Sequence, residues 1–355
     1  MKLGLYGLTL FLWGFAVQGC YSQVEGVKKN KLLDTQNIQS TYKNPVFNQN
    51  FPDPTIIKAA GGFYYGYGTN SKVNGNAIHI QVIRSKNLID WEFIGDALPE
   101  KPSWAYKDFW APDVLYDDKL QTYFLYYSGE NNETMGKCLG VATSKSPEGP
   151  FIDKGTPLLC GDGFVNIDPM AVDDINNNQK FLFWGSGFEA IKVQELAEDL
   201  MTFKEGSSPK ELIHPLTSGD PENYENLIEG VFITNESGYY YMYYSGDNCC
   251  GHSAHYAVMI ARSKHATGPY ESHKQVTGNP TNVILEKNNS WIAPGHNSII
   301  KDAAKQEWMF YHAIDVNNKN KGRVMLLDKI IYKNGWPQIE MNSPSTDVKV
   351  APITR

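Results

Sequence analysis

Five residues that could act as acids, bases or ligands recur at one position of a repeat in this chain. They are Asp53, Asp113, Asp168, Glu229 and His296, and each stands 10 to 13 residues before an aromatic segment. Paired carboxyl groups suit proton transfer, because one can hold a proton while the other accepts one. In a symmetric fold, residues at equivalent places converge on one point and form a site. Isolated acids before strands, in contrast, are usually solvated loop residues.

The aromatic segments define the repeat. They begin at residues 63, 123, 181, 239 and 308, so the intervals are 60, 58, 58 and 69 residues. Each is followed by a second alternating segment, such as HIQVIRS at 79–85 and YAVMIARS at 256–263. Aromatic and β-branched runs between Gly, Asn, Asp and Pro predict short antiparallel strands, and a period near sixty leaves room for four strands. We therefore predict an all-β fold, a five-bladed β-propeller whose first strands line a central channel.

The bulk composition favours one folded domain with a neutral ligand. No linker-like break appears between residues 41 and 340, and a propeller is a closed unit, so we predict a single catalytic domain at 42–355. The net charge of -7 and the 13% of aromatic residues argue against nucleic acid as a partner and favour a ligand that stacks on aromatic rings. These features leave the oligomeric state open.

Residues 1–20 resemble a lipoprotein signal peptide with a lipobox ending at Cys20. A charged start, Met1-Lys2, precedes an apolar stretch at 3–17 and the motif VQGC. Such a stretch is too short to span a membrane stably. An ordinary signal peptide with a chance cysteine is the alternative. The polar run at 21–41 is predicted to be a flexible tether. We expect an exported bacterial lipoprotein, at the outer membrane, at the cell surface or in the periplasm, with membrane contact only through the lipid anchor.

Four cysteines remain after Cys20, an even number in an oxidising compartment. Cys138 could pair with Cys160 across one blade, and Cys249 with Cys250 in a vicinal disulfide beside the site. Free buried thiols are the alternative, and the sequence does not choose between them. Neither CxxC nor HExxH occurs, so no metal-ligand spacing is present.

Three of the acids suit cleavage of a glycosidic bond, which requires a proton donor for the leaving oxygen and a second carboxylate on the opposite side. Asp53 lies between two prolines in FPDP, which stiffen the backbone and suit an ionised base. Glu229 lies in the apolar run LIEGV, where desolvation should raise its pKa and keep the proton that an acid needs. Asp168, in NIDP, is predicted to be a modulator that raises the pKa of the acid and orients it.

These motifs resemble glycoside hydrolase family 43, in its arabinan- and arabinofuranoside-cleaving branch. FPDP, WAPD at 110–113, IDP at 167–169, IEG at 228–230 and PGHNS at 294–298 match in order across residues 43–340. The resemblance implies a five-bladed propeller and an inverting mechanism that requires no cofactor. It also implies that the base, the modulator and the acid stand at Asp53, Asp168 and Glu229.

Further residues follow from the resemblance. Trp110 is expected to stack on a sugar face, unless it is core. Arg323, in GRV, matches an arginine that hydrogen-bonds a sugar hydroxyl, and Phe51 is the third expected substrate-binding residue. His296 matches a histidine that holds a calcium ion or a water cluster on the axis, although calcium takes six to eight oxygen ligands and one imidazole is a poor site alone. Asp113 is expected to brace a blade.

The expected function is inverting removal of α-L-arabinofuranosyl residues from arabinan or arabinoxylan, with an oligo- or polysaccharide as the partner. A β-xylosidase or an endo-1,5-arabinanase would use the same three acids, and their difference lies in blade loops that one sequence does not order. The Cys249-Cys250 pair and the segment SGFEAIKVQEL at 186–196 favour the arabinan-cleaving branches. A non-catalytic sugar-binding propeller would have no use for three positioned acids.

Overall fold

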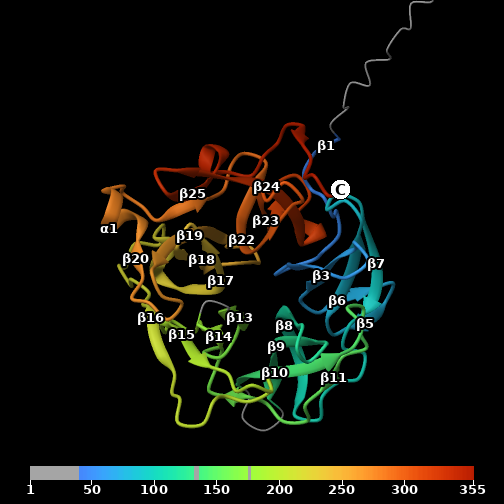
Figure 1. The fold of residues 1–355 in the computed structure, drawn as a ribbon. Helices are drawn as coiled ribbons and strands as arrows, with labels where there is room; N and C mark the ends of the chain where they lie inside the picture. The colour runs from blue at the N-terminus through green and yellow to red at the C-terminus, as the bar shows by residue number, and fades with distance from the viewer. Residues whose placement is uncertain (1–39, 132–135, 175–176) are drawn as a thin grey trace, which may run out of the picture. The chain divides into compact units, whose positions relative to one another are not determined.

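A computed structural model describes residues 40–131, 136–174 and 177–355. Five sheets of four or five strands surround a central axis, with their first strands innermost (Figure 1). The prediction of an all-β, five-bladed propeller is therefore confirmed. Within the described residues the α-helical content is one short element, α1 (His273–Thr277), at the outer edge of the fourth blade.

The strands follow each other in chain order within every blade. Blade 1 contains β2 (Thr55–Lys58), β3 (Tyr64–Gly68), β6 (Gln81–Ser85) and β7 (Trp91–Asp96), with a hairpin of β4 (Ser71–Val73) and β5 (Asn76–Ile78) between them. Blade 2 contains β8 (Ala105–Asp117), β9 (Thr122–Asn131), β10 (Lys137–Ser144), β11 (Ile152–Asp153) and β12 (Leu159–Cys160). Blade 3 contains β13 (Met170–Asp174), β14 (Gln179–Trp184), β15 (Ile191–Glu195) and β16 (Lys210–Ile213).

The last two blades have the same antiparallel order. Blade 4 contains β17 (Ile228–Glu236), β18 (Tyr239–Asn248), β19 (His255–Ser263), β20 (Glu271–Ser272) and β21 (Val283–Leu285). Blade 5 contains β22 (Trp291–Lys301), β23 (Glu307–Asp315), β24 (Arg323–Lys333) and β25 (Trp336–Ile339). In the described part of the chain, short 3-10 turns lie in connections at η1 (Tyr224–Asn226), η2 (Lys319–Lys321) and η3 (Glu340–Asn342).

The repeated aromatic segments are the second strands of the blades. They are apolar on both faces because each blade is covered by a neighbour on each side, so both faces of the strand are buried. Five hydrophobic clusters fill the spaces between successive blades, including the space between blade 5 and blade 1. The second predicted segment of each repeat forms the third strand of its sheet.

The N-terminal segment of the domain closes the ring. β1 (Thr41–Tyr42) pairs with β26 (Lys349–Val350), and Phe47 forms a bridge with Met325 in β24. The side chains of Tyr42 and Asn44 both donate hydrogen bonds to the backbone carbonyl of Leu327 in β24. Blade 1 is thereby held to blade 5 through backbone and side-chain hydrogen bonds from both ends of the domain.

One backbone feature recurs where each first strand meets the axis. A residue with positive φ stands there in every blade, and we call this the axial position; its residues are Asp53 (55°), Ala111 (45°), Asp168 (57°), Gly230 (61°) and His296 (46°). Non-glycine residues adopt this left-handed conformation rarely, at a cost of about 1–3 kcal/mol, and such strain concentrates at functional sites. The chain therefore bends sharply at the rim of the channel in all five blades.

Side chains from the preceding blade hold the axial positions. The N–H of Ala111 donates to Thr69 Oγ1, and the N–H of Asp168 donates to Ser128 Oγ. The N–H of His296 donates to Ser245 Oγ in the same way. Blade 5 supplies an imidazole instead, because the N–H of Asp53 donates to His312 Nδ1 at 3.2 Å. The pattern breaks at blade 4, where the N–H of Gly230 donates to a carboxylate, Asp168 Oδ2, at 3.0 Å.

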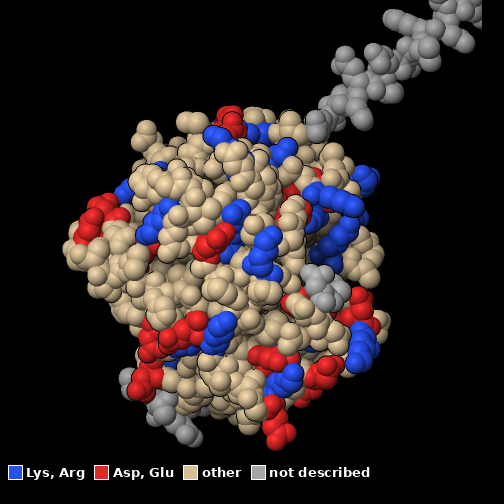
Figure 2. Space-filling view, turned by 60° about the vertical axis from the view of Figure 1, so that its left-hand side comes forward, with Lys and Arg blue, Asp and Glu red and all other residues tan. Residues whose placement is uncertain are grey.

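Acidic and basic side chains are interspersed with large uncharged areas on the face drawn in Figure 2.

The predicted signal peptide and nearly all of the predicted tether lie outside the described residues. Within the described residues, no helix combines the length and apolar character needed to cross a membrane.

Candidate active site

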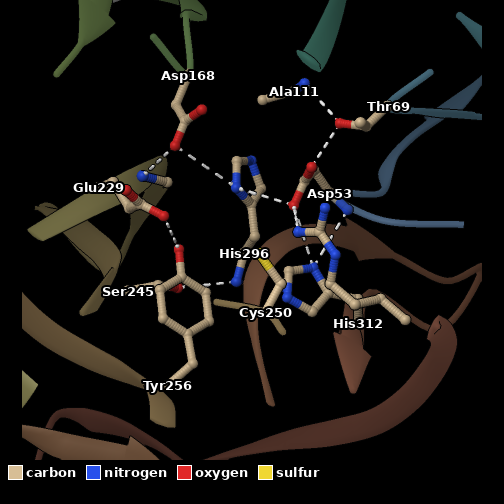
Figure 3. Close-up of polar contacts among 12 residues, drawn as sticks. Asp53, Thr69, Ala111, Asp168, Glu229, Ser245, Cys250, Tyr256, His296 and His312 are labelled. Atoms are coloured by element: carbon tan, nitrogen blue, oxygen red, sulfur yellow. Dashed lines mark hydrogen bonds and ion pairs between the residues drawn. The ribbon is translucent and has the colours of Figure 1, made fainter. Parts of the chain in front are cut away.

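A cavity of about 640 Å³ lies at the end of the axis where the first strands begin, and all five blades contribute to its wall. Its volume falls within the range of about 300–1,000 Å³ that is typical of small-molecule sites. The three predicted catalytic carboxyls, Asp53, Asp168 and Glu229, all line it, although more than 170 residues separate the first from the last. Figure 3 shows their side chains directed toward one another around His296.

Asp53 is the most strongly fixed of the three carboxyls. Arg323 Nη1 donates to its Oδ1 at 2.7 Å, and the Thr69 hydroxyl donates to its Oδ2. The imidazole nitrogens His312 Nδ1 and His296 Nδ1 lie 3.2 Å and 3.5 Å from Oδ1. Burial by itself would raise the pKa of Asp53, but the Arg323 guanidinium, with a smaller contribution from His296, outweighs it and holds that pKa well below its usual range. Asp53 is therefore a carboxylate at any working pH.

Glu229 has the opposite electrostatic setting. It follows Ile228 at the start of β17, and its two oxygens accept hydrogen bonds from Ser186 Oγ at 2.9 Å and Tyr256 OH at 2.8 Å. Burial raises the pKa of Glu229 to about 7, against the lowering effect of these two hydroxyls. A hydroxyl can also accept a hydrogen bond, so the pair accommodates the protonated acid as well as the carboxylate.

Asp168 connects the two. Its Oδ2 accepts from the Gly230 N–H next to Glu229 and lies 3.7 Å from His296 Nδ1. Burial raises the pKa of Asp168 well above its usual range, and the charge of Glu229 adds to this effect. Two interacting buried carboxyls titrate as a pair, so Asp168 and Glu229 resist losing both protons near neutral pH.

His296 contacts two of these carboxyls from the axial position of blade 5. Burial lowers the pKa of its imidazole, and the nearby guanidinium of Arg323 lowers it further against the opposing effect of Asp53. Gly230 approaches the ring closely, because a Cβ there would lie 3.1 Å from His296 Nδ1. A side chain at Gly230 would therefore displace the imidazole.

The surroundings of His296 do not fit a calcium ion held by protein side chains. Within the described residues no group of three His, Cys, Asp or Glu side chains could hold a metal ion, whereas calcium takes six to eight oxygen ligands. A small axial cavity of about 20 Å³ adjoins His296, and buried side-chain polar atoms of Asn297 and Ser298 line it without a protein partner. Its volume suits a single water molecule.

The predicted substrate-binding residues have different locations. Trp110 lines the cavity, but the Lys137 ammonium lies over its ring, 4.0 Å from the centroid. Arg323 also lines the cavity and is committed to Asp53. Phe51 is fully buried, in edge-on contact with Phe47 within the cluster between blades 5 and 1, so its ring cannot reach a ligand in the cavity. The expectation that Phe51 contacts substrate has to be corrected accordingly.

Asp113 does not belong to the cavity. It lies two residues after the axial position of blade 2, buried, where Thr55 Oγ1 and the Ala171 N–H donate to its two oxygens at 3.0 Å and 2.9 Å. Burial raises the pKa of Asp113 to about 6. It joins blades 1, 2 and 3 and is the expected brace.

Sequence reasoning did not identify several residues of the site. Thr69 and Ser186 follow second strands and His312 lies within one, where a single hydroxyl or imidazole looks like an ordinary strand residue, although their shared position in the repeat was a usable signal. Tyr256 is fully buried in β19, where it looks like an ordinary core residue. The ring of Phe188 is 63% exposed at the cavity rim, 6.0 Å from that of Phe164.

The two cysteine pairs differ. Cys138 and Cys160 form a disulfide across blade 2, as the sequence allowed. Cys249 and Cys250 are free thiols, and both line the cavity.

Comparisons with known proteins agree with this geometry. The family model for glycosyl hydrolases family 43 matches residues 42–337. The extracellular exo-alpha-(1->5)-L-arabinofuranosidase ArbA of Cellvibrio japonicus is 26% identical, over 74% of this chain and 80% of its own length. The extracellular endo-alpha-(1->5)-L-arabinanase 1 of Bacillus subtilis is 27% identical, over 82% of this chain and 88% of its own length.

A crystal structure of a thermostable family-43 glycoside hydrolase superimposes with a TM-score of 0.73 and 28% identity, over 88% of this chain and 99% of the other. The family match and the structural superposition both extend across the propeller. This chain belongs to glycosyl hydrolases family 43 and is a glycoside hydrolase.

Proposed function

We propose that this protein hydrolyses glycosidic bonds with inversion, using Asp53 as general base, Glu229 as general acid and Asp168 as modulator. The proposal rests on one observation: two carboxyls in the same cavity have pKa values displaced in opposite directions. Groups whose environments separate their pKa values in this way are suited to base and acid roles. A purely sugar-binding propeller would gain nothing from this separation.

The reaction proceeds by a single displacement. Asp53 accepts a proton from a water molecule, whose oxygen attacks the anomeric carbon as the bond to the leaving oxygen breaks. Glu229 gives its proton to that leaving oxygen. Arg323 and Thr69 fix the direction of the Asp53 carboxylate, so that its free lone pairs face the water. Asp53 then carries a proton and Glu229 none, and exchange with solvent restores both.

Asp168 would act through Glu229. It accepts a hydrogen bond from the N–H of Gly230, the residue that follows the acid, and the charge of Glu229 raises the pKa of Asp168. Loss of one negative charge from this pair therefore changes the proton affinity of the other. The sugar hydroxyls nearest the anomeric carbon would complete the contacts of Asp168 during the reaction.

The proposed substrate is an α-L-arabinofuranosyl linkage in arabinan or arabinoxylan, with removal of the terminal sugar. The relatives named exo-arabinofuranosidase and endo-arabinanase support arabinan as the polymer. The exposed Phe188 and its neighbour Phe164 would receive the sugar next to the scissile bond. Endo-1,5-arabinanase activity is the second candidate, because the relative named endo-arabinanase matches at 27% identity, against 26% for the exo-arabinofuranosidase.

A substrate panel tests this assignment. The enzyme should release nitrophenol from nitrophenyl α-L-arabinofuranoside and arabinose from linear arabinan, and should act far more slowly on nitrophenyl β-xyloside. Release of arabino-oligosaccharides without free arabinose would favour endo action. A preference for the xyloside would contradict the substrate, and no activity on any of the three, relative to an Asp53→Asn control, would contradict the hydrolase assignment.

We also propose that the protein is exported and anchored through a lipid on Cys20, with the propeller outside the cytoplasm. The signal-like residues 1–20 and the polar residues 21–41 support this location. Two relatives carry the word extracellular in their names.

A further inference from the structure

Two adjacent thiols form part of the cavity wall, and the proposed reaction does not use them. Cys249 and Cys250 follow β18 in the connection to β19, directly after Asp247 and Asn248, which also line the cavity. The Asn248 side chain closes this turn, since its Nδ2 donates to Ser253 O at 3.1 Å. Both thiols are therefore held at the cavity by a turn with its own internal hydrogen bond.

The two cysteines have different surroundings. Cys249 is half-buried against Tyr256, Ala293 and Ile314, whereas Cys250 is exposed. The neighbouring Cys249 thiol lowers the pKa of Cys250 to about 6 against the effect of burial, and the Arg323 guanidinium lowers it further. An exposed cysteine beside a cation is the kind of thiol that reacts with disulfides and thiophilic reagents.

We propose that Cys249 and Cys250 form a reversible redox-modification site in the cavity wall, a dithiol that closes to a vicinal disulfide and thereby alters substrate binding and the setting of Glu229. The inference depends on the proposed function only for its kinetic consequence. Cys138 and Cys160 are already joined in a disulfide, so the fold contains one closed pair and one open pair.

The step balances with a small disulfide, such as oxidised glutathione, as oxidant. The Cys250 thiolate attacks one sulfur of that disulfide, and the other sulfur leaves as a thiolate that takes up a proton. The Cys249 thiol then loses its proton, and its sulfur attacks Cys250 Sγ in the mixed disulfide. A second small thiol departs. The protein loses two electrons and two protons, and the oxidant becomes two thiols.

Formation of the Cys249–Cys250 disulfide would affect Glu229 through Tyr256. Cys249 packs against Tyr256, which donates a hydrogen bond to Glu229 Oε1 at 2.8 Å. The charge of Cys250 also raises the pKa of Glu229. A disulfide carries no charge, so closure removes this effect and moves the decline of activity at high pH to lower pH. Closure also draws the exposed sulfur toward Cys249, which reshapes the wall beside Arg323.

Two measurements that need no activity test the site itself. Oxidised glutathione should remove the mass of two hydrogen atoms from the full-length protein, with a peptide that contains Cys249 and Cys250 cross-linked. Phenylarsine oxide, which bridges two neighbouring thiols, should bind the untreated protein one to one, and bind neither the Cys249→Ser nor the Cys250→Ser variant. A pair that stays reduced, or arsenical binding that survives both substitutions, would overturn the proposal.

Kinetics then test the coupling. Oxidation should change KM for nitrophenyl α-L-arabinofuranoside severalfold and move the alkaline limb of the pH-rate profile, and dithiothreitol should reverse both changes. The Cys249→Ser/Cys250→Ser double variant, checked for folding by circular dichroism, should not respond to the oxidant. An equal response in the double variant, or a closed disulfide with unchanged kinetics, overturns the coupling. Failure of the proposed hydrolase activity would appear separately, as an inactive protein that still binds the arsenical.

Discussion

The ring of Tyr256 is stacked parallel to the imidazole of His312, with an interplanar angle of 1° and centroids 5.8 Å apart. Each of the two holds a different carboxyl residue: Tyr256 donates to Glu229 Oε1, and His312 Nδ1 accepts from the Asp53 N–H. Gly295, in β22 of blade 5, lies against Tyr256, and a Cβ at Gly295 would come within 2.1 Å of the ring. The stacked pair therefore sets the proposed acid relative to the proposed base.

Replacement of Tyr256 by Phe should raise the pKa of Glu229 above about 7, because the lost hydroxyl favours the ionised carboxylate. Glu229 must be protonated to act, so activity should persist to higher pH, with the alkaline limb displaced by about one unit, equivalent to ~1.4 kcal/mol. The pH dependence of kcat/KM on nitrophenyl α-L-arabinofuranoside measures this limb. Tyr241→Phe is the matched control, because that hydroxyl donates to Gly335 O in the turn between β24 and β25 of blade 5. An unmoved limb in Tyr256→Phe would show that the hydroxyl does not tune the acid.

Replacement of Asp168 by Asn should have the opposite effect on the same limb. Asp168 and Glu229 interact, since the charge of Glu229 raises the pKa of Asp168. We expect removal of the Asp168 carboxyl to let Glu229 ionise more readily, so that the decline of activity begins at lower pH. The loss of activity should be large at neutral pH and smaller in acid. Asp174→Asn removes another buried carboxylate, at the far end of β13, where Tyr240 OH donates to it at 2.6 Å. That control should leave the limb in place, and a shift in both variants would indicate a general effect of altered charge.

The repeat in the sequence located the site to within two residues but not its exact geometry. Asp53, Asp168 and His296 occupy axial positions as the spacing predicted. Glu229 stands one residue before the axial Gly230, and Asp113 stands two residues after the axial Ala111. Successive side chains of a strand point to opposite faces, so an offset of one residue turns the side chain of Glu229 to the other face. An offset of two residues keeps the face but moves the side chain of Asp113 along the strand. These offsets decide that Glu229 enters the cavity and that Asp113 braces the blades.

The contacts that tune the carboxyls could not be predicted from residue types. Ser186 donates to Glu229, whereas Ser128 and Ser245, at the same place in their blades, accept from backbone N–H groups. The difference arises because the Gly230 N–H is engaged by Asp168, which depends on packing between blades. Phe51 was misjudged for a related reason: its neighbour Asp53 faces the cavity, while Phe51, two residues earlier, is drawn into the core where the ring closes.

Hydrolysis should invert the anomeric configuration. An inverting enzyme needs room for a water molecule between base and sugar, with carboxyl groups about 6.5–9.5 Å apart. Proton NMR of the first sugar formed, recorded before mutarotation, identifies the anomer. Retention would mean that Asp53 attacks the sugar as a nucleophile, and the proposed role of base would then be wrong.

Replacement of Cys20 by Ser should release the protein from the membrane fraction when it is expressed in a bacterium that processes lipoproteins. The reason is that a cysteine carrying several acyl chains anchors stably, whereas the polar residues after it have no affinity for lipid. Immunoblots of membrane and soluble fractions measure the distribution. Cys250→Ser is a control that alters a cysteine without touching the signal. Equal membrane association of the Cys20→Ser variant and the native protein would exclude the lipid anchor.

The roles of Asp53 and Glu229 can be separated by the leaving group. General acid catalysis typically contributes on the order of 10²- to 10⁴-fold, so Glu229→Gln should lose about that factor on arabinan. It should lose much less on an activated aryl arabinofuranoside, because an aryloxide departs with little protonation. Asp53→Asn should be equally inactive on both substrates, since the water needs its base whatever group leaves. Asp113→Asn, a buried carboxyl in the brace, serves as the control for loss of stability, and its effect should not depend on the leaving group. Equal losses on both substrates in Glu229→Gln would show that another residue of the cavity is the general acid. The hydrogen bond from Tyr256 would then position Glu229 for a role other than proton donation.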